Sequence, residues 1–309
     1  MKIFDRSRKF GLLVTIITAC TLEYVGPATA RPVQNPNNPY SDTSLVAGFT
    51  STQGIIIQPA LTATAPPKRD FSVQASNLSF LPLISLYYGD SVWGMLRLID
   101  IDRALNDLRQ LTGISPTCND KGCYTITNRL PGSEGLNWAK EHVYKQLDDL
   151  GYSVELQNWS RSGYADQNVI ARKPGVLHPE EEVFFVAHID GKNSPAADDN
   201  GSGVVDILEL ARVLNGYTFN RTVVMFFSTG EEQGSLGVDS YLDQLTPGEL
   251  SAIRYVVNID MVGYDANSDS VMELWHGDHP PSRALTQMIR DTIQDHLIDL
   301  KPDLVTGCG

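Results

Sequence analysis

One histidine and three aspartates crowd into the stretch A-H-I-D-G-K-N-S-P-A-A-D-D-N-G-S-G, residues 187–203. The stretch directly follows the run E-V-F-F-V, which is typical of a buried strand. Carboxylates packed this tightly repel one another unless a positive charge lies between them. We therefore expect a bound cation among His188, Asp190, Asp198 and Asp199.

Two later apolar runs are also followed at once by acidic residues. The run V-V-M-F-F-S-T precedes Glu231 and Glu232, and Y-V-V-N-I precedes Asp260. In open α/β sheets, ligands bind outside the carboxyl ends of the strands. These acids and His188 should therefore converge on one rim of a sheet, although they lie far apart in the sequence.

The ligand types narrow the choice of metal. Imidazole with monodentate carboxylates suits zinc, with cobalt or manganese as substitutes, whereas all-oxygen sites suit calcium or magnesium. Asp199, Glu232 and Asp260 contribute three negative charges and a bound hydroxide a fourth, which two divalent ions balance. We therefore predict two zinc ions at this rim.

Two short patterns suggest roles within such a site. His188 and Asp190 are two residues apart, so on a strand they share a face, and Asp190 can fix the tautomer of a metal-bound imidazole. Of the adjacent glutamates, one can bind metal while its neighbour takes a proton from bound water.

The rest of the chain alternates between helical and strand patterns. Helices are expected at residues 100–113, 132–151, 201–215, 235–245 and 281–297, and strands at 153–159, 168–173, 181–189, 221–229, 253–260, 270–275 and 303–307. Apolar strands separated by helices predict a three-layer α/β fold. Its central sheet should be mostly parallel, with helices on both faces.

The first thirty residues are typical of an export signal, with a basic start and a short apolar run, F-G-L-L-V-T-I-I-T-A. Two processing sites compete. The small residues A-T-A at 28–30 suit cleavage before Arg31, whereas I-T-A-C resembles a lipobox that would place a lipid on Cys20. Either reading predicts an extracytoplasmic protein, secreted, periplasmic or lipid-anchored at the cell surface.

Export also sets the cysteine chemistry and the domain boundaries. In an oxidising compartment, Cys118 and Cys123 are expected to form a small disulfide loop. Residues 31–95 are rich in Pro, Asn and Thr and predict a linker or pro-segment, with apolar residues from about 76 that suggest strands. Residues 96–129, a helix and the cysteine loop, should lead into a main domain at 130–309.

Composition excludes two classes of partner. The 309 residues include 24 Lys and Arg against 37 Asp and Glu, a net charge of -13. Such a balance argues against nucleic acid and against anionic membrane surfaces. The apolar run of the signal is too short to span a bilayer, so no integral membrane span is expected after its removal.

Four motifs, A-H-I-D-G, A-D-D-N-G-S-G, S-T-G-E-E-Q-G-S-L-G and N-I-D-M-V-G, resemble in order and spacing the co-catalytic zinc exopeptidases of metallopeptidase family 28. The secreted bacterial leucyl-type aminopeptidases are the most similar subgroup. The resemblance covers about residues 130–309 and the helix before them, and none is seen at 31–95. It implies peptide substrates with a free amino terminus, and apolar first residues.

The resemblance also implies roles for single residues. His188 and Asp260 would hold one zinc ion, Glu232 would help to hold the second, and Asp199 would bridge both. Glu231 would be the general base and acid, with Asp190 as the orienting carboxylate. Asp199 is preferred to Asp198 as the bridge because the bridging aspartate of the family stands three residues before the Ser of a Ser-Gly pair, and Asp199 has this position here.

The chain departs from the family pattern at its end. The family takes a further zinc-binding histidine from a Ser-Asp-His segment downstream of Asp260, and the sequence stops at Gly309 about where that segment should begin. A carboxyl-truncated chain that binds the second ion poorly, and that could be inactive, is therefore expected. The alternatives are a carboxypeptidase or dipeptidase of the same fold, and a non-catalytic or single-zinc cyclotransferase relative.

Overall fold

The computed structural model describes residues 24–27, 92, 94–296 and 298–307 of the chain. The predicted lipid site at Cys20 and most of the segments at 1–30 and 31–95 lie outside these residues. The described helical turn at 94–96 buries Met95 and Leu96, so a turn of helix stands where the apolar pattern suggested strand.

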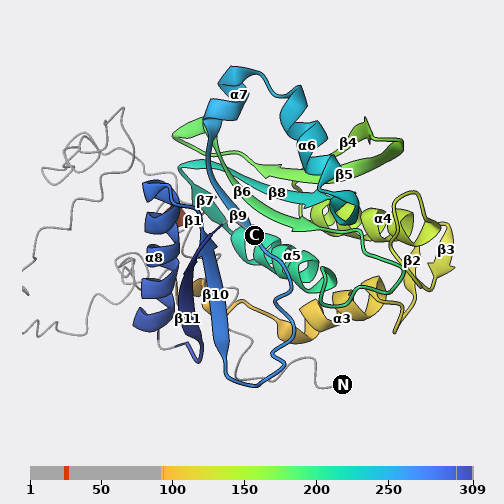
Figure 1. Ribbon diagram of the computed structural model, residues 1–309, viewed down its shortest axis with the longest axis horizontal. Helices are drawn as coiled ribbons and strands as arrows, with labels where there is room; N and C mark the ends of the chain where they lie inside the picture. The colour runs from red at the N-terminus through yellow and green to blue at the C-terminus, as the bar shows by residue number, and fades with distance from the viewer. Residues whose placement is uncertain (1–23, 28–91, 93, 297, 308–309) are drawn as a thin grey trace, which may run out of the picture.

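A five-stranded sheet forms the centre of the fold (Figure 1). Its order is β4 (Ser153–Arg161), β5 (Tyr164–Lys173), β8 (Arg221–Ser228), β6 (His178–His188) and β9 (Ile253–Asn258). Strand β6 runs parallel to both β8 and β9, whereas β5 runs antiparallel to β4 and β8. The predicted α/β architecture is confirmed, with a sheet that is half parallel and half antiparallel.

The antiparallel half of the sheet follows from a two-residue turn. Arg161 pairs with Tyr164, so only Ser162 and Gly163 connect the two strands, and both have positive φ, 53° and 84°. Such a turn matches the twist of an antiparallel pair and reverses the chain at once. Parallel pairing of the two strands, by contrast, would need a long crossover.

Helices cover both faces of the sheet (Figure 1). On one face lie α4 (Glu134–Asp149) and α5 (Gly201–Leu214), with α3 (Ile101–Leu111) packed against α5. On the other lies α6 (Leu236–Gln244), whose Tyr241 contacts Phe184 and Phe226.

Alternate strand residues supply the two cores. Phe185 faces the α5 side, and its neighbour Phe184 faces the α6 side. Burial of each such ring stabilises the fold by about 1.5–3 kcal/mol. Because both faces are packed, the parallel strands have little freedom to shift in register. The ends of β6, β8 and β9 are thereby held on one rim.

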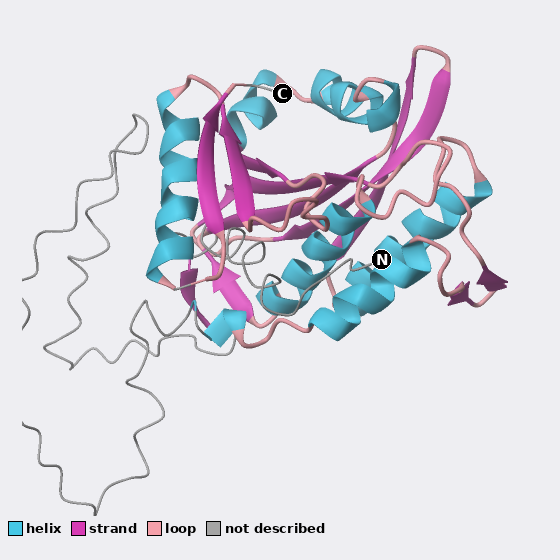
Figure 2. Cartoon of the chain, turned by 60° about the horizontal axis from the view of Figure 1, so that its bottom comes forward, coloured by secondary structure: helices cyan, strands magenta, loops and turns pink. Residues whose placement is uncertain are grey.

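A smaller unit packs beside the sheet. Strands β10 (Val271–His276) and β11 (Lys301–Thr306) pair in parallel, connected by α8 (Pro280–Asp295), which runs beside them (Figures 1 and 2). Leu274, Ile289 and Ile293 join this unit to the main core. No helix in the described part of the chain has both the length and the apolar character needed to cross a membrane.

The remaining elements are short. Strands β2 (Thr117–Asn119) and β3 (Gly122–Tyr124) form a hairpin closed by a disulfide between Cys118 and Cys123, as the sequence predicted. Strand β1 (Tyr24–Pro27), inside the expected export signal, pairs with β7 (Tyr217–Phe219). A 3-10 turn, η3 (Glu231–Gln233), follows β8, and α7 (Pro247–Ala252) precedes β9.

Candidate metal centre

The parallel half of the sheet ends in the acidic residues that the sequence singled out. His188 is the last residue of β6, Asp260 lies two residues beyond β9, and η3 begins three residues beyond β8. Asp199 stands one residue before Asn200, the N-cap of α5. Parallel strands bring all of these positions to the same rim.

Three ligand atoms meet there. One atom each from His188, Asp199 and Asp260 lies within 4.8 Å of the other two. His188 Nε2 is 3.1 Å from Asp199 Oδ1 and 3.6 Å from Asp260 Oδ1. The nitrogen is buried and has no hydrogen-bond partner within the described residues, a rare state for a polar atom. A divalent cation between an imidazole and two carboxylates would satisfy it.

The local field also favours a positive charge. Burial opposes ionisation of the imidazole, but hydrogen bonding and the charges of Asp190 and Asp260 outweigh burial and raise the pKa of His188 to about 10. Burial, and then the charge of Glu232, raises the pKa of Asp199, with His188 acting in the opposite direction. The carboxylates around His188 thus favour a positive charge at this position.

The two glutamates of η3 face different neighbours. Glu231 Oε2 lies 3.9 Å from His188 Nε2, and burial, reinforced by the charges of Asp190 and Asp260, raises the pKa of Glu231. Glu232 is 5% exposed and pairs with the exposed Lys192 at 2.8 Å. Glu232 therefore stands beside the three-atom cluster but is already neutralised by a lysine.

Asp190 links β6 to this glutamate turn. Its carboxylate accepts hydrogen bonds from the backbone N–H groups of Glu231, at 3.3 Å, and Glu232, at 3.2 Å. His188 Nδ1 lies 3.2 Å from the backbone carbonyl of Asp190 and 3.6 Å from its carboxylate. The carbonyl rather than the expected carboxylate is thus at hydrogen-bond distance. Donation to it from Nδ1 leaves the lone pair of Nε2 facing the cluster.

Asn200 joins two ligand-bearing segments, a role that the sequence analysis did not assign. Its side chain caps α5 by accepting from Gly203 N at 3.0 Å and donates to the carbonyl of Ile259 at 2.7 Å. Asp199 and Asp260 are the neighbours of these two residues, so the bond holds the two carboxylates together. A Cβ on Gly203 would stand 2.4 Å from Asn200 Oδ1, so only glycine fits.

Ser202 and Asp198 complete this connection. Ser202 Oγ donates to the carbonyl of Asp198 at 2.7 Å and accepts from Val262 N at 3.0 Å. The carboxylate of Asp198 accepts from Gly263 N at 2.8 Å. Asp198 is therefore engaged in loop structure, whereas Asp199 is the member of the aspartate pair that faces His188. An Asn followed by G-S-G is a helix-cap signal that could have pointed to Asn200.

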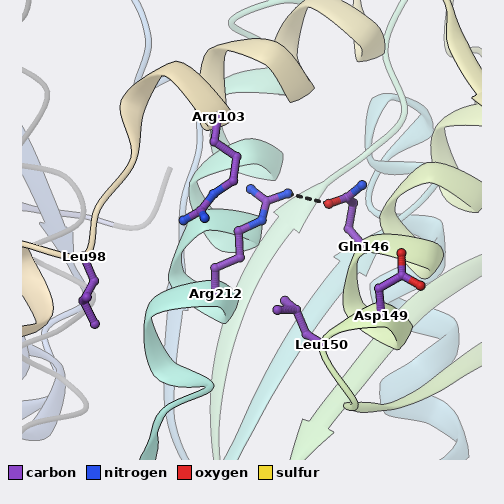
Figure 3. A pocket seen from close by; sticks show the side chains of 6 residues that line it. All are labelled: Leu98, Arg103, Gln146, Asp149, Leu150 and Arg212. Carbon is purple, nitrogen blue, oxygen red and sulfur yellow. Dashed lines mark hydrogen bonds between the residues drawn. The ribbon is translucent and has the colours of Figure 1, made fainter.

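A separate cavity of about 330 Å³ lies between α3, α4 and α5 (Figure 3). The two arginines that line it already have partners within the protein. Arg212 donates to Gln146 at 2.7 Å, and both Arg103 and Arg212 form ion pairs with Glu209. Arg212 is twelve residues from Asn200, or about 18 Å along the helix. The cavity is thus remote from the metal centre.

Comparison with known proteins agrees with the geometry. Residues 168–303 match the model of Peptidase family M28. Aminopeptidase YwaD of Bacillus subtilis (strain 168) is 38% identical over 99 residues, which are 31% of this chain and 22% of that protein. The chain spans about a third or less of the length of the curated relatives it matches.

Two solved structures share the fold. BSAP, a zinc aminopeptidase from Bacillus subtilis, has a TM-score of 0.57 at 15% identity and covers 68% of this chain and 80% of its own. The glutaminyl cyclase of Macrostomum lignano has a TM-score of 0.52 at 15% identity, with 70% and 74% covered. At these identities the likeness concerns the fold alone. The region that matches the model of Peptidase family M28, residues 168–303, includes all the candidate ligands.

Proposed function

We propose that this chain is a zinc-dependent aminopeptidase that hydrolyses the first peptide bond of peptides with a free amino terminus. One observation carries the proposal above all: the buried Nε2 of His188, which makes no hydrogen bond to the described residues, faces the carboxylates of Asp199 and Asp260. The match to the model of Peptidase family M28 and the similarity to an aminopeptidase support the choice of peptide hydrolysis.

The residues fit a metal in two steps. His188, Asp199 and Asp260 would hold the first ion, and Asp199 with Glu232 would hold a second once Lys192 has swung away. Zinc bound there lowers the pKa of an attacking water and polarises the substrate carbonyl. Asp190 holds the histidine and the glutamate turn in place by its bonds to both.

Glu231 is the proposed general base. It takes the proton of the attacking water and later returns it to the leaving amine. The raised pKa of Glu231 suits this exchange, because a carboxylate with a low pKa is too weak a base to keep the proton between the two transfers. Its side chain is 39% exposed, so the carboxylate is open to solvent while it lies beside His188.

The substrate proposal follows from charge and exposure. Surplus carboxylates would bind the α-ammonium group of a peptide. Met261, directly after Asp260, and Tyr264, four residues after it, are 58% and 62% exposed and offer apolar surface for the first side chain. We extend the proposal to apolar first residues such as leucine.

The test is a paired substrate assay with metal analysis. The purified chain should cleave a leucine anilide with a free amine, leave its N-acetyl counterpart intact, and lose activity to a chelator and regain it with zinc. Equal cleavage of both substrates would show that no free amine is required and would contradict an aminopeptidase, whereas release of the last residue from an N-acetyl peptide with a free carboxylate would favour a carboxypeptidase. No transition metal after dialysis against zinc, with indifference to chelators, would exclude the proposal.

A single-zinc glutaminyl cyclase is the second candidate. Pairing of Glu232 with Lys192 favours it, because only three ligand atoms then remain for one cation. One bound zinc per chain, together with cyclisation of an amino-terminal glutamine, would select it. Two bound ions and leucine anilide cleavage would select the aminopeptidase.

Export is also a proposal. The basic and apolar amino terminus and the disulfide between Cys118 and Cys123 support an oxidising, extracytoplasmic location. Mass spectrometry of the mature chain would distinguish cleavage before Arg31 from lipid attachment at Cys20. An uncleaved chain recovered from the cytoplasm would contradict both.

A further inference from the structure

Arg129 is a fully buried arginine that the sequence analysis passed over. All four of its hydrogen bonds run to backbone carbonyls: Nε to Ile189 at 2.6 Å, Nη1 to Leu111 at 3.0 Å and Pro195 at 2.5 Å, and Nη2 to Ala196 at 2.8 Å. An arginine without water normally pairs with a carboxylate, because burial of the charge is costly. Here main-chain dipoles solvate it.

Three of these four carbonyls belong to the two ends of one loop, and the fourth is that of Leu111 at the end of α3. Ile189, Pro195 and Ala196 lie in the segment that connects His188 at the end of β6 with Asp199 before α5. The backbone of Arg129 also accepts from Gly191 N at 3.0 Å. One rigid, planar group therefore fixes both ends of the loop between two candidate ligands.

The loop is closed tightly around this contact. A Cβ on Gly191 would stand 2.4 Å from Ala196 Cβ, so the two sides of the loop touch. Gly201 at the start of α5 donates to the same Ala196 carbonyl that Arg129 binds. Movement of the guanidinium would thus be passed to the first turn of α5.

The charge of Arg129 acts on the same site. Burial lowers its pKa to about 10, opposed by Asp190 and Asp199, so the side chain remains positive at neutral pH. Its field reaches those two carboxylates from a fully buried position. It offsets part of their mutual repulsion without occupying the position of a ligand.

We propose that Arg129 is a positioning residue of the metal centre, which holds loop 189–196 so that His188 and Asp199 present their ligand atoms together before a cation arrives. The inference rests on the proposed cation site. Preorganised ligands bind more tightly because ordering them has no further cost on binding. Groups that orient ligands typically change metal affinity by about 10- to 100-fold.

The test compares two arginine-to-lysine variants. Arg129→Lys keeps the charge but loses the planar fork that spans both ends of the loop. Arg212→Lys is the matched control, because Arg212 is also buried, 7% exposed, yet serves Asp107 and Glu209 at the far end of α5. Both should lower thermal stability, and only Arg129→Lys should affect the metal centre.

Cobalt affinity and its visible ligand-field spectrum are measured well below the melting temperature of each protein. Arg129→Lys should bind cobalt about 10- to 100-fold more weakly and with an altered spectrum, while Arg212→Lys matches the wild type. Wild-type affinity and spectrum in folded Arg129→Lys would overturn this inference but leave the proposed function standing. Absence of cobalt binding by the wild type would overturn the proposed function itself.

A second variant serves if Arg129→Lys does not fold. Gly191→Ala leaves Arg129 intact but pushes the two sides of the loop apart. Gly191→Ala should weaken cobalt binding in the same way, because it is the loop, and not the guanidinium, that is directly connected to His188 and Asp199. Unchanged cobalt affinity in folded Gly191→Ala would overturn the positioning role.

Discussion

The two ends of helix α5 both carry clustered carboxylates, but they neutralise them differently. At the carboxyl end, Asp107 and Glu209 are paired with Arg212 at 2.6 and 3.2 Å, and Glu209 also with Arg103 at 2.5 Å. His142 lies 3.1 Å from Asp107. This cluster contains its own counter-charges and is structural.

At the amino end, the acids outnumber the cations. Asp199 and Asp260 share His188, and the exposed Lys192 forms its ion pair with Glu232. The buried Arg129 contributes positive charge, but all of its hydrogen bonds go to backbone carbonyls and none to a carboxylate. In the proposed metal centre, unlike the cluster at the carboxyl end, full neutralisation of the carboxylates would need an ion from outside.

The largest effect should come from the proposed base. Glu231→Ala should lower kcat by about two to four orders of magnitude, because no group then accepts the proton of the attacking water. Zinc content, measured by atomic emission, should remain at the wild-type level. Wild-type turnover in this variant would remove Glu231 from the mechanism.

At the other end of α5, loss of a counter-charge should affect folding and not metal. Arg212→Met removes the arginine that Asp107 and Glu209 share, leaves them with His142 and Arg103, and should cost about 3–5 kcal/mol of unfolding free energy. Denaturant titration measures this cost, and zinc affinity of the folded protein should be unchanged. A fall in zinc affinity would mean that the two clusters are coupled.

The aspartate pair provides an internal control for the metal centre. Asp199→Asn should weaken zinc binding by about 100-fold or more, beyond the range typical of groups that only orient ligands. Asp198→Asn, whose carboxylate accepts from Gly263 N, should bind zinc much more nearly as the wild type does. Calorimetry on both variants checks the difference, and a reversed order would exchange their roles.

The smallest effect concerns Lys192. Its exposed ammonium competes with any cation that approaches Glu232, so Lys192→Ala should strengthen binding of the second zinc ion by about two- to fivefold. A competition titration with a chromophoric chelator resolves this change. Weaker binding would show that the lysine supports the site instead of competing for it.

Strong local patterns predicted most of the fold. The long helices and the buried strands have periods that sequence alone reveals, and α5 and β6 lie where those periods placed them. The sheet was expected to be mostly parallel, and the antiparallel pairing of β4 with β5 was not predicted. The two-residue turn at Ser162–Gly163 leaves no long loop in the sequence to mark the reversal of the chain. Short elements such as β7 and α7 escaped notice because three to six residues cannot establish a period.

The candidate site divides in the same way. Acids at strand ends could be predicted to converge, because parallel strands share a rim, and the structure brings His188, Asp199 and Asp260 together. The role of Arg129 could not be predicted. Its partners are backbone carbonyls 18 to 67 residues away, and a carbonyl contact does not depend on the type of side chain, so it leaves no pattern in the sequence. Lys192 is likewise one lysine among many until the fold places it beside Glu232.

The bond between Asn200 and the carbonyl of Ile259 has a consequence for the order of assembly. It connects residues 59 positions apart, and Asp260, the last of the three clustered ligands, enters only with the segment after β9. A nascent chain that ends at β8 has His188 and Asp199 but neither the third ligand nor the partner of Asn200. The three clustered ligands therefore come together only after the sheet has accepted β9.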